Sequence, residues 1–543
     1  MRKSKQRYFY LFVNVIILLC ILLEDPNTVS WDFLTSNRLL PGGRYLQALT
    51  SPPSTYNQSH IERAVPQLHS FAPRLLVFHN NTFEVYIIKH NMTFYHDNHD
   101  FNYRAVTIIP LLIHTLRTYL PHRFAPNMPP FQLLFTDSDS LRTHCVNPQE
   151  WAACDTHNWS PILAFGSLMK DSATTFPTVQ LMPTPPFMEC LYNYVILQKK
   201  TEECQRKETL SGGGGIYQPA PTTNVDLQDL IPTIVWRGSD YAFLYEYEKF
   251  RFWDIQKVLG DDDDIRNLTK YDVAIRLFQH WNDIGPRWRS IALSLQAELE
   301  QQQQYYYDNQ QNHQDHNSNQ STILLPVWLN SRLVGPIPYI SPDLIQHLDT
   351  MGVHVQESEM SLQQMAMTYR YHLDLGGGGG TSWLGTISKL RMPGVLFHHE
   401  TPTKDWFHGE DMIAWKHYIP IQWDLTDLRA KYDWAEATIN NHQIRQITQE
   451  ATQLANYLVS PTYMQRIFDS YFVQSLPQIV HAYQSSPSDP TFMTWDACLH
   501  HYQQSGFQLQ RMAICQEKQC TIQAEAIPTV ISMRKLRHQP LGT

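Results

Sequence analysis

Apolar residues in the middle of the chain form short runs separated by stretches with helical spacing. The runs "ILLPVWL", "YRYHLDL" and "GVLFHHE" have the length of strands, and helical patterns lie between them. Such alternation is typical of a parallel sheet in an α/β domain. Residues 434–482 are largely helical in pattern. We therefore expect an α/β fold with a parallel sheet.

The N-terminal part carries a similar mixture of patterns. "LLVFHNNTFEVYIIKH" alternates and predicts a pair of strands, and "RAVTIIPLLIHTLRTYL" has helical spacing that Pro121 ends. "PFQLLFTDSDS" predicts a buried strand that runs into a polar turn with Asp137 and Asp139. Near the centre, "LIPTIVWRGSDY" is another apolar run that ends on charge and glycine.

Low-complexity tracts divide the chain. "SGGGGIYQPAPTTN" has linker composition, whereas "DDDD" at 261–264 and the Gln- and Tyr-rich tract at 301–320 carry too little apolar surface to fold. These shifts predict a cytosolic tail and membrane helix (1–30), a stem (31–70), an N-terminal domain (71–205), a linker (206–228), a C-terminal domain (229–485, with an insert at 299–321) and a C-terminal extension (486–543).

Residues 1–30 have the pattern of a targeting segment. A basic head precedes an apolar run from Tyr8 to Leu23, and Glu24 and Asp25 follow. As a helix the run spans about 24 Å, close to the thickness of the thinner membranes of the early secretory pathway. We favour an uncleaved signal anchor over a cleaved signal peptide, although Thr28 to Ser30 would suit cleavage. The basic residues before the run place the rest of the chain in the lumen, as a single-pass type II membrane protein.

Two further features agree with a luminal chain. N-x-S/T sequons occur at Asn57, Asn80, Asn91, Asn158, Asn267 and Asn319. Outside the apolar run the cysteines fall into local groups, which suit disulfides in an oxidising compartment: Cys145 with Cys154, Cys190 with Cys204, and Cys498 with Cys515 and Cys520.

Composition and charge exclude several classes of protein. The 543 residues are 43% hydrophobic and 12% aromatic, which describes a globular protein rather than a disordered one. The formal net charge of -9 offers no basic footprint, so we expect no nucleic-acid partner. No C-x-x-C or H-E-x-x-H spacing occurs, and the adjacent His398 and His399 would point to opposite faces of a strand, so we expect no metal site.

The segment "YRYHLDLGGGGGTSWLGTISKL" places a glycine run between a strand and a helix that Thr381 or Ser382 would cap. Free N–H groups at a helix N-terminus attract anions, and glycine lets an anion approach without a Cβ in the way. The segment therefore suits a phosphate, but a flexible loop is an alternative, because it matches neither the Walker nor the G-x-G-x-x-G pattern.

Three segments, read together, resemble a known family. "WRGSDY", "YRYHLDLGGGGGTSW" and "WFHGEDMIAWKHYIPIQWDLTDL" occur in the order and spacing of the CAP10-type glycosyltransferases, glycosyltransferase family 90, which includes the protein O-glucosyltransferases and O-xylosyltransferases. The most specific match lies at Trp415, His417, Tyr418, Pro420, Asp424, Leu425, Asp427 and Leu428. The resemblance spans about residues 125 to 440.

The resemblance implies a GT-B fold, in which two Rossmann-like domains face each other across a cleft. It makes 71–205 the acceptor-side domain and 229–485 the nucleotide-sugar-binding domain. It implies an inverting transfer of a sugar, glucose or xylose, from a UDP-sugar to a hydroxyl of a protein or glycan acceptor in the Golgi or endoplasmic reticulum. No cofactor or metal ion is expected. In the donor site the resemblance places Arg237 on the diphosphate, beside Gly238 and Ser239. It adds, at the end of the helix, Gly379, Gly380, Thr381, Ser382 and Trp383.

The resemblance also suggests a catalytic base and a sugar pocket. The family strand that ends in the acceptor-activating aspartate aligns with Asp139, although Asp137 stands two residues away and both could instead be turn or capping residues. By position, His399 and Glu400 line the sugar pocket.

One departure from the family pattern concerns the diphosphate. Leu384 stands where the family has a second arginine, and Lys389 is a candidate replacement. The alternative function is therefore an inactive luminal carbohydrate-binding protein on the same fold.

Overall fold

In a computed structural model of the chain, the contacts divide the protein into two units, residues 1–48 and 49–543. The first unit lies outside the described residues. The structure describes 55–64, 74–79, 82–90, 103–124, 131–136, 159–168, 179–201, 225–240, 243–244, 252, 254–260, 267–314, 326–335, 341–355, 362–377, 384–407, 411–483, 507–516 and 519–522.

A six-stranded sheet occupies the C-terminal half, and all its neighbouring strands pair in parallel. Its strands are β7 (Ile231–Gly238), β8 (Leu329–Val334), β9 (His354–Val355), β10 (Tyr369–Asp374), β11 (Val395–His399) and β13 (Ile419–Ile421). The spatial order is β13-β11-β10-β7-β8-β9. Counted along the chain this is 6-5-4-1-2-3, the order of doubly wound nucleotide-binding sheets. The expected parallel α/β sheet is confirmed, and its topology is compatible with a Rossmann-like domain.

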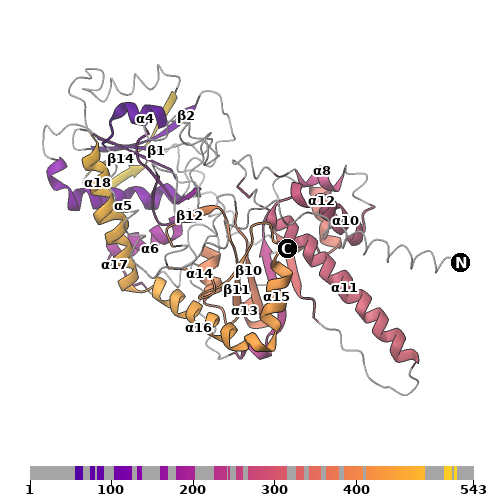
Figure 1. Ribbon diagram of the computed structural model, residues 1–543. Helices are drawn as coiled ribbons and strands as arrows, with labels where there is room; N and C mark the ends of the chain where they lie inside the picture. The colour runs from indigo at the N-terminus through magenta and orange to yellow at the C-terminus, as the bar shows by residue number, and fades with distance from the viewer. Residues whose placement is uncertain are drawn as a thin grey trace, which may run out of the picture. The chain divides into compact units, whose positions relative to one another are not determined.

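Helices connect these strands, as a parallel sheet requires. They are α8 (Ile255–Leu259), α10 (Lys270–Gln279) and α11 (Pro286–Gln314) after β7, α12 (Pro342–Thr350) after β8, α13 (Leu362–Thr368) after β9, α14 (Leu384–Leu390) after β10 and α15 (Leu428–Glu436) after β13, with short 3-10 turns at Leu227–Asp229, Trp281–Asp283 and Thr438–Asn440. In Figure 1 the far half of α11 extends beyond its neighbouring helices.

A seven-stranded mixed sheet is built largely from the N-terminal half. Its strands are, in spatial order, β15 (Gln519–Ile522), β14 (Phe507–Gln516), β2 (Thr82–His90), β1 (Arg74–His79), β3 (Phe131–Phe135), β4 (Ile162–Ala164) and β6 (Val179–Leu181). The predicted strand pair is confirmed as the antiparallel β1 and β2, and the predicted buried strand is β3, whose residues are all buried. A separate pair joins β5 (Gly166–Leu168) to β12 (Thr403–Asp405).

The remaining helices belong with the mixed sheet or follow the parallel one. They are α4 (Gln58–Ala64), α5 (Tyr103–Tyr119), a 3-10 turn (Pro121–Phe124), α6 (Pro185–Val195), α16 (Asn441–Leu458), α17 (Pro461–Phe468), the π-helical turn η10 (Asp469–Gln474) and α18 (Ser475–Ala482). The predicted helix before Pro121 is α5, and the prediction that 434–482 is largely helical is confirmed.

Strand β11 contributes to two separate hydrophobic cores. Val395 and Phe397 pack with α8, α10, α11, α12 and α15, whereas Leu396 packs with α14 and with the core of the mixed sheet. Successive side chains of a strand point to opposite faces, so the parallel sheet is covered on both sides. This double cover explains why the first three residues of β11, Val395 to Phe397, are all apolar rather than alternating.

Two sequence predictions were wrong in detail. The run "ILLPVWL" was expected to be a strand, but β8 begins at its last residue, Leu329, and continues into the polar "NSRLV". The tract at 301–320 was expected not to fold, yet α11 continues through Gln314. Once a helix has been nucleated by packing, extending it through Gln and Tyr costs little, and this explains the second difference.

Cysteines and membrane segments lie mostly outside the described residues. Within them, Cys515 stands opposite Cys520 across the β14–β15 hairpin, and Cys190 is buried on α6. None of the described helices has the length and hydropathy to cross a bilayer, and the apolar run from Tyr8 to Leu23 lies outside the part that the structure describes.

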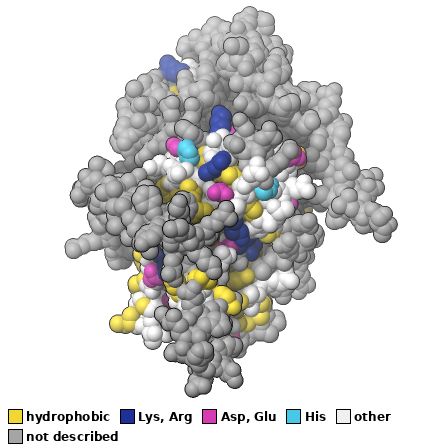
Figure 2. Space-filling model, turned by 90° about the vertical axis from the view of Figure 1, so that its right-hand side faces the viewer, with side chains coloured by type: hydrophobic (Ala, Val, Ile, Leu, Met, Phe, Trp, Pro, Cys, Tyr) yellow, Lys and Arg dark blue, Asp and Glu magenta, His cyan; other side chains and the backbone are white. Residues whose placement is uncertain are grey.

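The charged side chains visible in Figure 2 are of both signs and interspersed, without a basic stripe on the described part of that face.

Candidate functional site

The strand order of the parallel sheet singles out one place on its carboxyl edge. The chain starts at β7, builds outward through β8 and β9, and then returns to β10 on the other side of β7. Ligands of doubly wound sheets bind beyond the carboxyl ends of the strands where the order reverses. Here that point lies between Gly238, the last residue of β7, and Asp374, the last residue of β10.

The end of β7 is tied to β8 by two of the residues expected in the donor site, Arg237 and Ser239. Arg237 Nη1 donates to the carbonyls of Trp236 and Asn330, at 2.8 Å each. Ser239 Oγ donates to the Val334 carbonyl at 3.1 Å. A Cβ on Gly238 would lie 2.6 Å from the Trp236 ring, so glycine is required there by packing. In the structure, one nitrogen of Arg237 is therefore already committed to backbone carbonyls.

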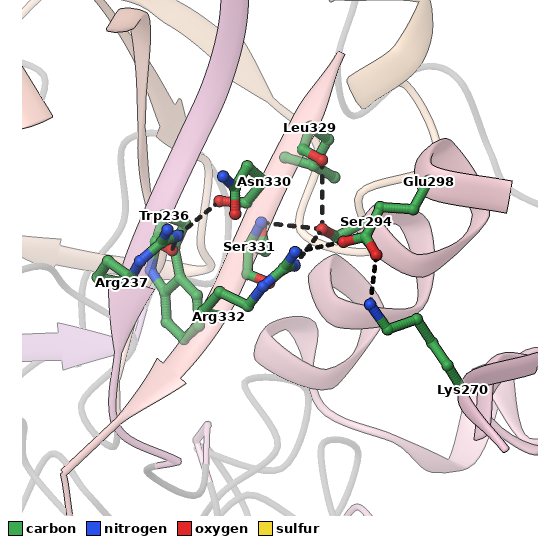
Figure 3. A network of polar contacts seen from close by, with 9 residues as sticks. All are labelled: Trp236, Arg237, Lys270, Ser294, Glu298, Leu329, Asn330, Ser331 and Arg332. Atoms are coloured by element: carbon green, nitrogen blue, oxygen red, sulfur yellow. Dashed lines mark hydrogen bonds and ion pairs between the residues drawn. The ribbon is translucent and has the colours of Figure 1, made fainter. Parts of the chain in front are cut away.

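A second arginine, Arg332 on β8, forms an ion pair with the carboxylate of Glu298. Its Nη2 pairs with Glu298 on α11, and its Nη1 donates to Ser294 Oγ at 2.9 Å. Lys270 Nζ bonds the other oxygen of Glu298 at 2.6 Å. Figure 3 shows Arg332 turned toward Glu298 and Ser294, whereas Arg237 lies beside Trp236 and Asn330. This network fastens α11 to the sheet, and Arg332 and Lys270 share one carboxylate.

The glycine run begins where β10 ends, and a buried histidine holds its first residue. Gly376 N–H donates to His399 Nδ1 at 3.2 Å, and His399 Nε2 donates to the Trp423 carbonyl at 2.8 Å. Burial lowers the pKa of His399 to about 3. A neutral imidazole with its proton on Nε2 satisfies both contacts, so His399 links the ends of β10, β11 and β13. In the structure His399 positions these strand ends, whereas the sequence analysis expected it to line the sugar pocket.

A cluster of polar side chains surrounds Asp374, which is only 4% exposed. Lys389 Nζ lies 2.7 Å from Oδ1 and also donates to the Leu373 carbonyl, while Thr386 Oγ1 and His398 Nδ1 lie 2.5 and 3.2 Å from Oδ2. Burial opposes ionisation of this carboxyl, but Lys389 and His398 outweigh it and hold the pKa of Asp374 well below its ordinary value. Lys389, the candidate replacement for the family arginine, is therefore paired within the protein.

Glu400 lies at the end of β11 and is partly buried. Tyr418 OH donates to Glu400 Oε1 at 2.8 Å, and Glu400 N–H donates to the Ile421 carbonyl. The Tyr418 ring meets His398 edge to face at 4.9 Å. Glu400 thus stands on the same edge as His399 and Asp374, fixed by Tyr418.

The first turn of α11 also reaches this edge, a feature that the sequence did not reveal. Arg287 donates to the Ser239 carbonyl and, at 3.5 Å, to the Leu375 carbonyl, so it bridges the ends of β7 and β10. A Cβ on Gly377 would lie 3.3 Å from Arg287 Nη2. Trp288 Nε1 donates to Asp240 Oδ2 at 2.9 Å. The motif "GPRWR", with proline at the first helical position, was the signal that could have revealed a helix start there.

Several residues singled out from the sequence lie outside the described part of the chain. They are Asp137 and Asp139 beyond β3, and Gly379, Gly380, Thr381, Ser382 and Trp383 before α14. The predicted helix itself is confirmed as α14. Among the described residues, no three His, Cys, Asp or Glu side chains gather as a metal site would require. His398 and His399 bind different partners, Asp374 and Trp423.

Comparison with known proteins gives short, distant matches. No protein-family model matches the chain. Protein O-glucosyltransferase 3 of Rattus norvegicus is 30% identical over 97 residues, which cover 16% of this chain and 18% of the relative. Protein O-glucosyltransferase 3 of Homo sapiens is 28% identical over 109 residues, which cover 19% of this chain and 20% of the relative. The chain thus matches about a fifth of the length of these relatives, and this supports a glycosyltransferase of distant relationship.

Proposed function

We propose that the protein is an inverting glycosyltransferase that moves glucose or xylose from a UDP-sugar to a hydroxyl of a protein or glycan acceptor. The membrane anchor would hold it in the Golgi or endoplasmic reticulum, with the catalytic part in the lumen. One observation carries the proposal: at the reversal point of a doubly wound sheet, a glycine turn starts between Arg287 and His399. The local similarity to protein O-glucosyltransferases points in the same direction.

The proposed mechanism divides the work between two domains of a GT-B fold. The parallel sheet would bind the donor, with the diphosphate on the glycine turn, near Arg237, Ser239 and Ser382. The mixed sheet would supply the base, since β3 leads toward Asp139. Asp139 would take the proton from the acceptor hydroxyl, which attacks the anomeric carbon as UDP leaves. Protein cations and N–H groups would stabilise the departing diphosphate without a metal ion.

Calorimetry with a panel of nucleotide sugars tests the proposal. The full-length protein in detergent should bind at least one UDP-sugar and not the matching GDP-sugar. Failure of every UDP-sugar to bind the folded protein would reject the donor assignment and with it the enzyme.

Two substitutions separate the proposed roles. Asp139→Asn should lower transfer by about two to four orders of magnitude with little change in UDP-sugar affinity. Arg237→Ala should weaken donor binding as well as turnover. Asp137→Asn is the matched control and should be mild. Loss of transfer in Asp137→Asn alone would move the base two residues along the same strand face.

A second candidate is a carbohydrate-binding protein without transferase activity. The specific observation behind it is the loss of positive charge at the donor site: Leu384 begins α14 where the related family carries arginine, and Lys389 pairs with Asp374. UDP-sugar binding without turnover toward any acceptor or water would favour this candidate.

A further inference from the structure

Arg289, in the first turn of α11, is buried in an aromatic cage. Only 1% of the residue is exposed. Its guanidinium lies 5.2 Å from the ring of Trp423, 5.4 Å from Trp281 and 5.6 Å from Phe252. Its Nε donates to the Trp281 carbonyl at 2.9 Å. Rings hold such a cation in place by cation–π attraction, but they accept no conventional hydrogen bonds in its plane.

One nitrogen of this guanidinium has no partner. Arg289 Nη1 is buried and makes no hydrogen bond within the described part of the chain. Burial lowers the pKa of Arg289 to about 10, and the nearby carboxylate of Asp424 counteracts the shift, so the side chain is charged at neutral pH. A buried charge with an unsatisfied donor is costly, and proteins normally supply such a group with an anion.

Arg289 lies at the carboxyl edge of the sheet. Trp423, whose ring contacts the guanidinium, follows β13, and its carbonyl accepts from His399 at the end of β11. His399 in turn accepts from Gly376, the first glycine of the turn. Arg287 is two residues earlier in α11 and leaves the helix on a different side. The unsatisfied donor is thus linked to the glycine turn through Trp423 and His399.

The other cations near this edge have partners within the protein. Lys389 is paired with Asp374, and Arg332 with Glu298. Arg237 and Arg287 donate to backbone carbonyls. These contacts fix the positions of Arg237 and Arg287 without removing their charge, and a further cation at this edge would add to the stabilisation of a leaving diphosphate.

We propose that Arg289 binds the diphosphate of the nucleotide sugar and takes over the task of the arginine that Leu384 replaces. The inference rests on the proposed function and adds a residue to its donor site. Trp423 is the most exposed of the three cage rings, at 37%. The diphosphate reaches Nη1 by displacing the Trp423 side chain, and the remaining rings keep the guanidinium plane fixed.

The test measures binding of UDP and of inorganic pyrophosphate to the full-length protein in detergent, by calorimetry at low and high salt. The variants are Arg289→Met, whose side chain has a similar size but no charge, and Arg289→Lys, whose side chain keeps the charge but lacks the planar guanidinium and its paired N–H donors. The control is Arg370→Met. Arg370 lies at the opposite end of β10, and its Nε, Nη1 and Nη2 are bonded to Leu227, Glu436 and Leu230.

We expect Arg289→Met to weaken UDP binding by about tenfold or more and Arg289→Lys to weaken it less. Arg289→Met removes an unsatisfied buried charge but also loses the bond to the Trp281 carbonyl and the contacts with the rings, so its melting temperature should fall less than that of Arg370→Met. Arg370→Met should lose stability and keep its affinity for UDP. Should Arg289→Met fail to fold, Arg289→Lys and the rise in melting temperature of the native protein with pyrophosphate still report on the site.

Each result is decisive. Unchanged UDP affinity in both Arg289 variants overturns the inference and leaves the proposed function standing, with Arg289 a structural residue. Pyrophosphate binding that depends on Arg289, without binding of UDP or any UDP-sugar, supports the anion site and overturns the proposed function. Binding of neither probe to the native protein overturns both.

Discussion

The two edges of the parallel sheet handle buried charge differently. At the amino edge, Arg370 on β10 satisfies its donors with Glu436 and two carbonyls, and Glu436 also accepts from Tyr371 OH. At the carboxyl edge, Arg289 keeps a donor without a partner in the described structure. Satisfied charges contribute to stability, whereas a buried charge with an unsatisfied donor lowers it. The carboxyl edge is fastened as well, by Arg332 with Glu298 and by Asp374 with Lys389. The two edges therefore differ in the donor of Arg289, which we propose to be kept for a ligand.

The largest effect is expected from Asp374→Asn, which tests whether the carboxyl edge also contains a structural charge. The variant leaves Lys389 buried without its counterion, so the free energy of unfolding should fall by about 3 kcal/mol or more. Denaturant unfolding measures it. Adding Lys389→Met should recover part of the loss, and a double variant no more stable than the single one would contradict the ion-pair account.

The pH dependence of that loss has a defined sign. Because the pKa of Asp374 is lower in the folded than in the unfolded protein, its contribution is complete above the unfolded value and is lost as pH falls through the folded value. The difference between native protein and Asp374→Asn should therefore shrink below about pH 4.

A somewhat smaller effect is expected at the amino edge from Gly394→Ala. The new Cβ would lie 2.3 Å from the Arg370 carbonyl oxygen, which belongs to the backbone and cannot swing away. We expect a loss of about 1–3 kcal/mol, measured by denaturant unfolding, with unchanged UDP affinity of the folded fraction. Gly385→Ala is the control, because a Cβ there meets no atom within 4 Å. Loss of affinity in Gly394→Ala would show that the two edges are coupled.

Acid should lower the stability of the folded protein through two buried histidines, one near each edge of the sheet. Burial lowers the pKa of His372 and of His399 to about 3. Between about pH 6.5 and 3 each of these histidines is protonated in the unfolded chain but not in the folded protein. The free energy of unfolding therefore falls as pH falls, by at most about 1.4 kcal/mol per pH unit for each histidine.

Substitution tells the two histidines apart. Both His372→Leu and His399→Leu should flatten this slope in unfolding measurements at several pH values. Only His399→Leu should also weaken UDP binding, because it releases Gly376 and Trp423. An unchanged slope in both variants would assign the acid sensitivity to other groups.

The smallest effect, about 1 kcal/mol, is expected from Glu436→Gln. Arg370 keeps its two carbonyl partners and loses only a partly exposed carboxylate. Thermal unfolding measures the change, and UDP binding should be unaffected. A loss as large as that of Asp374→Asn would contradict the view that the amino edge tolerates the removal of one partner.

Much of this sheet could be predicted because its signals are local. The apolar runs of β7, β10 and β11 and the glycines after β10 are read within a few residues. The contacts of Arg287 and Arg289 could not be predicted, because tertiary folding brings Arg287 to the ends of β7 and β10 and places the ring of Trp423 against Arg289. The polar "NSRLV" of β8 was missed because Ser294 and Glu298, which satisfy it, lie on another element.

The reach of α11 has an evolutionary consequence. Its 29 residues extend about 43 Å, and the contacts of Arg287, Ser294 and Glu298 with the sheet all lie in the first half. Gains or losses of glutamine within 301–304 would alter only the outer end of the helix, so natural variants that differ in the length of this tract should keep the contacts of Arg287, Ser294 and Glu298 with the sheet.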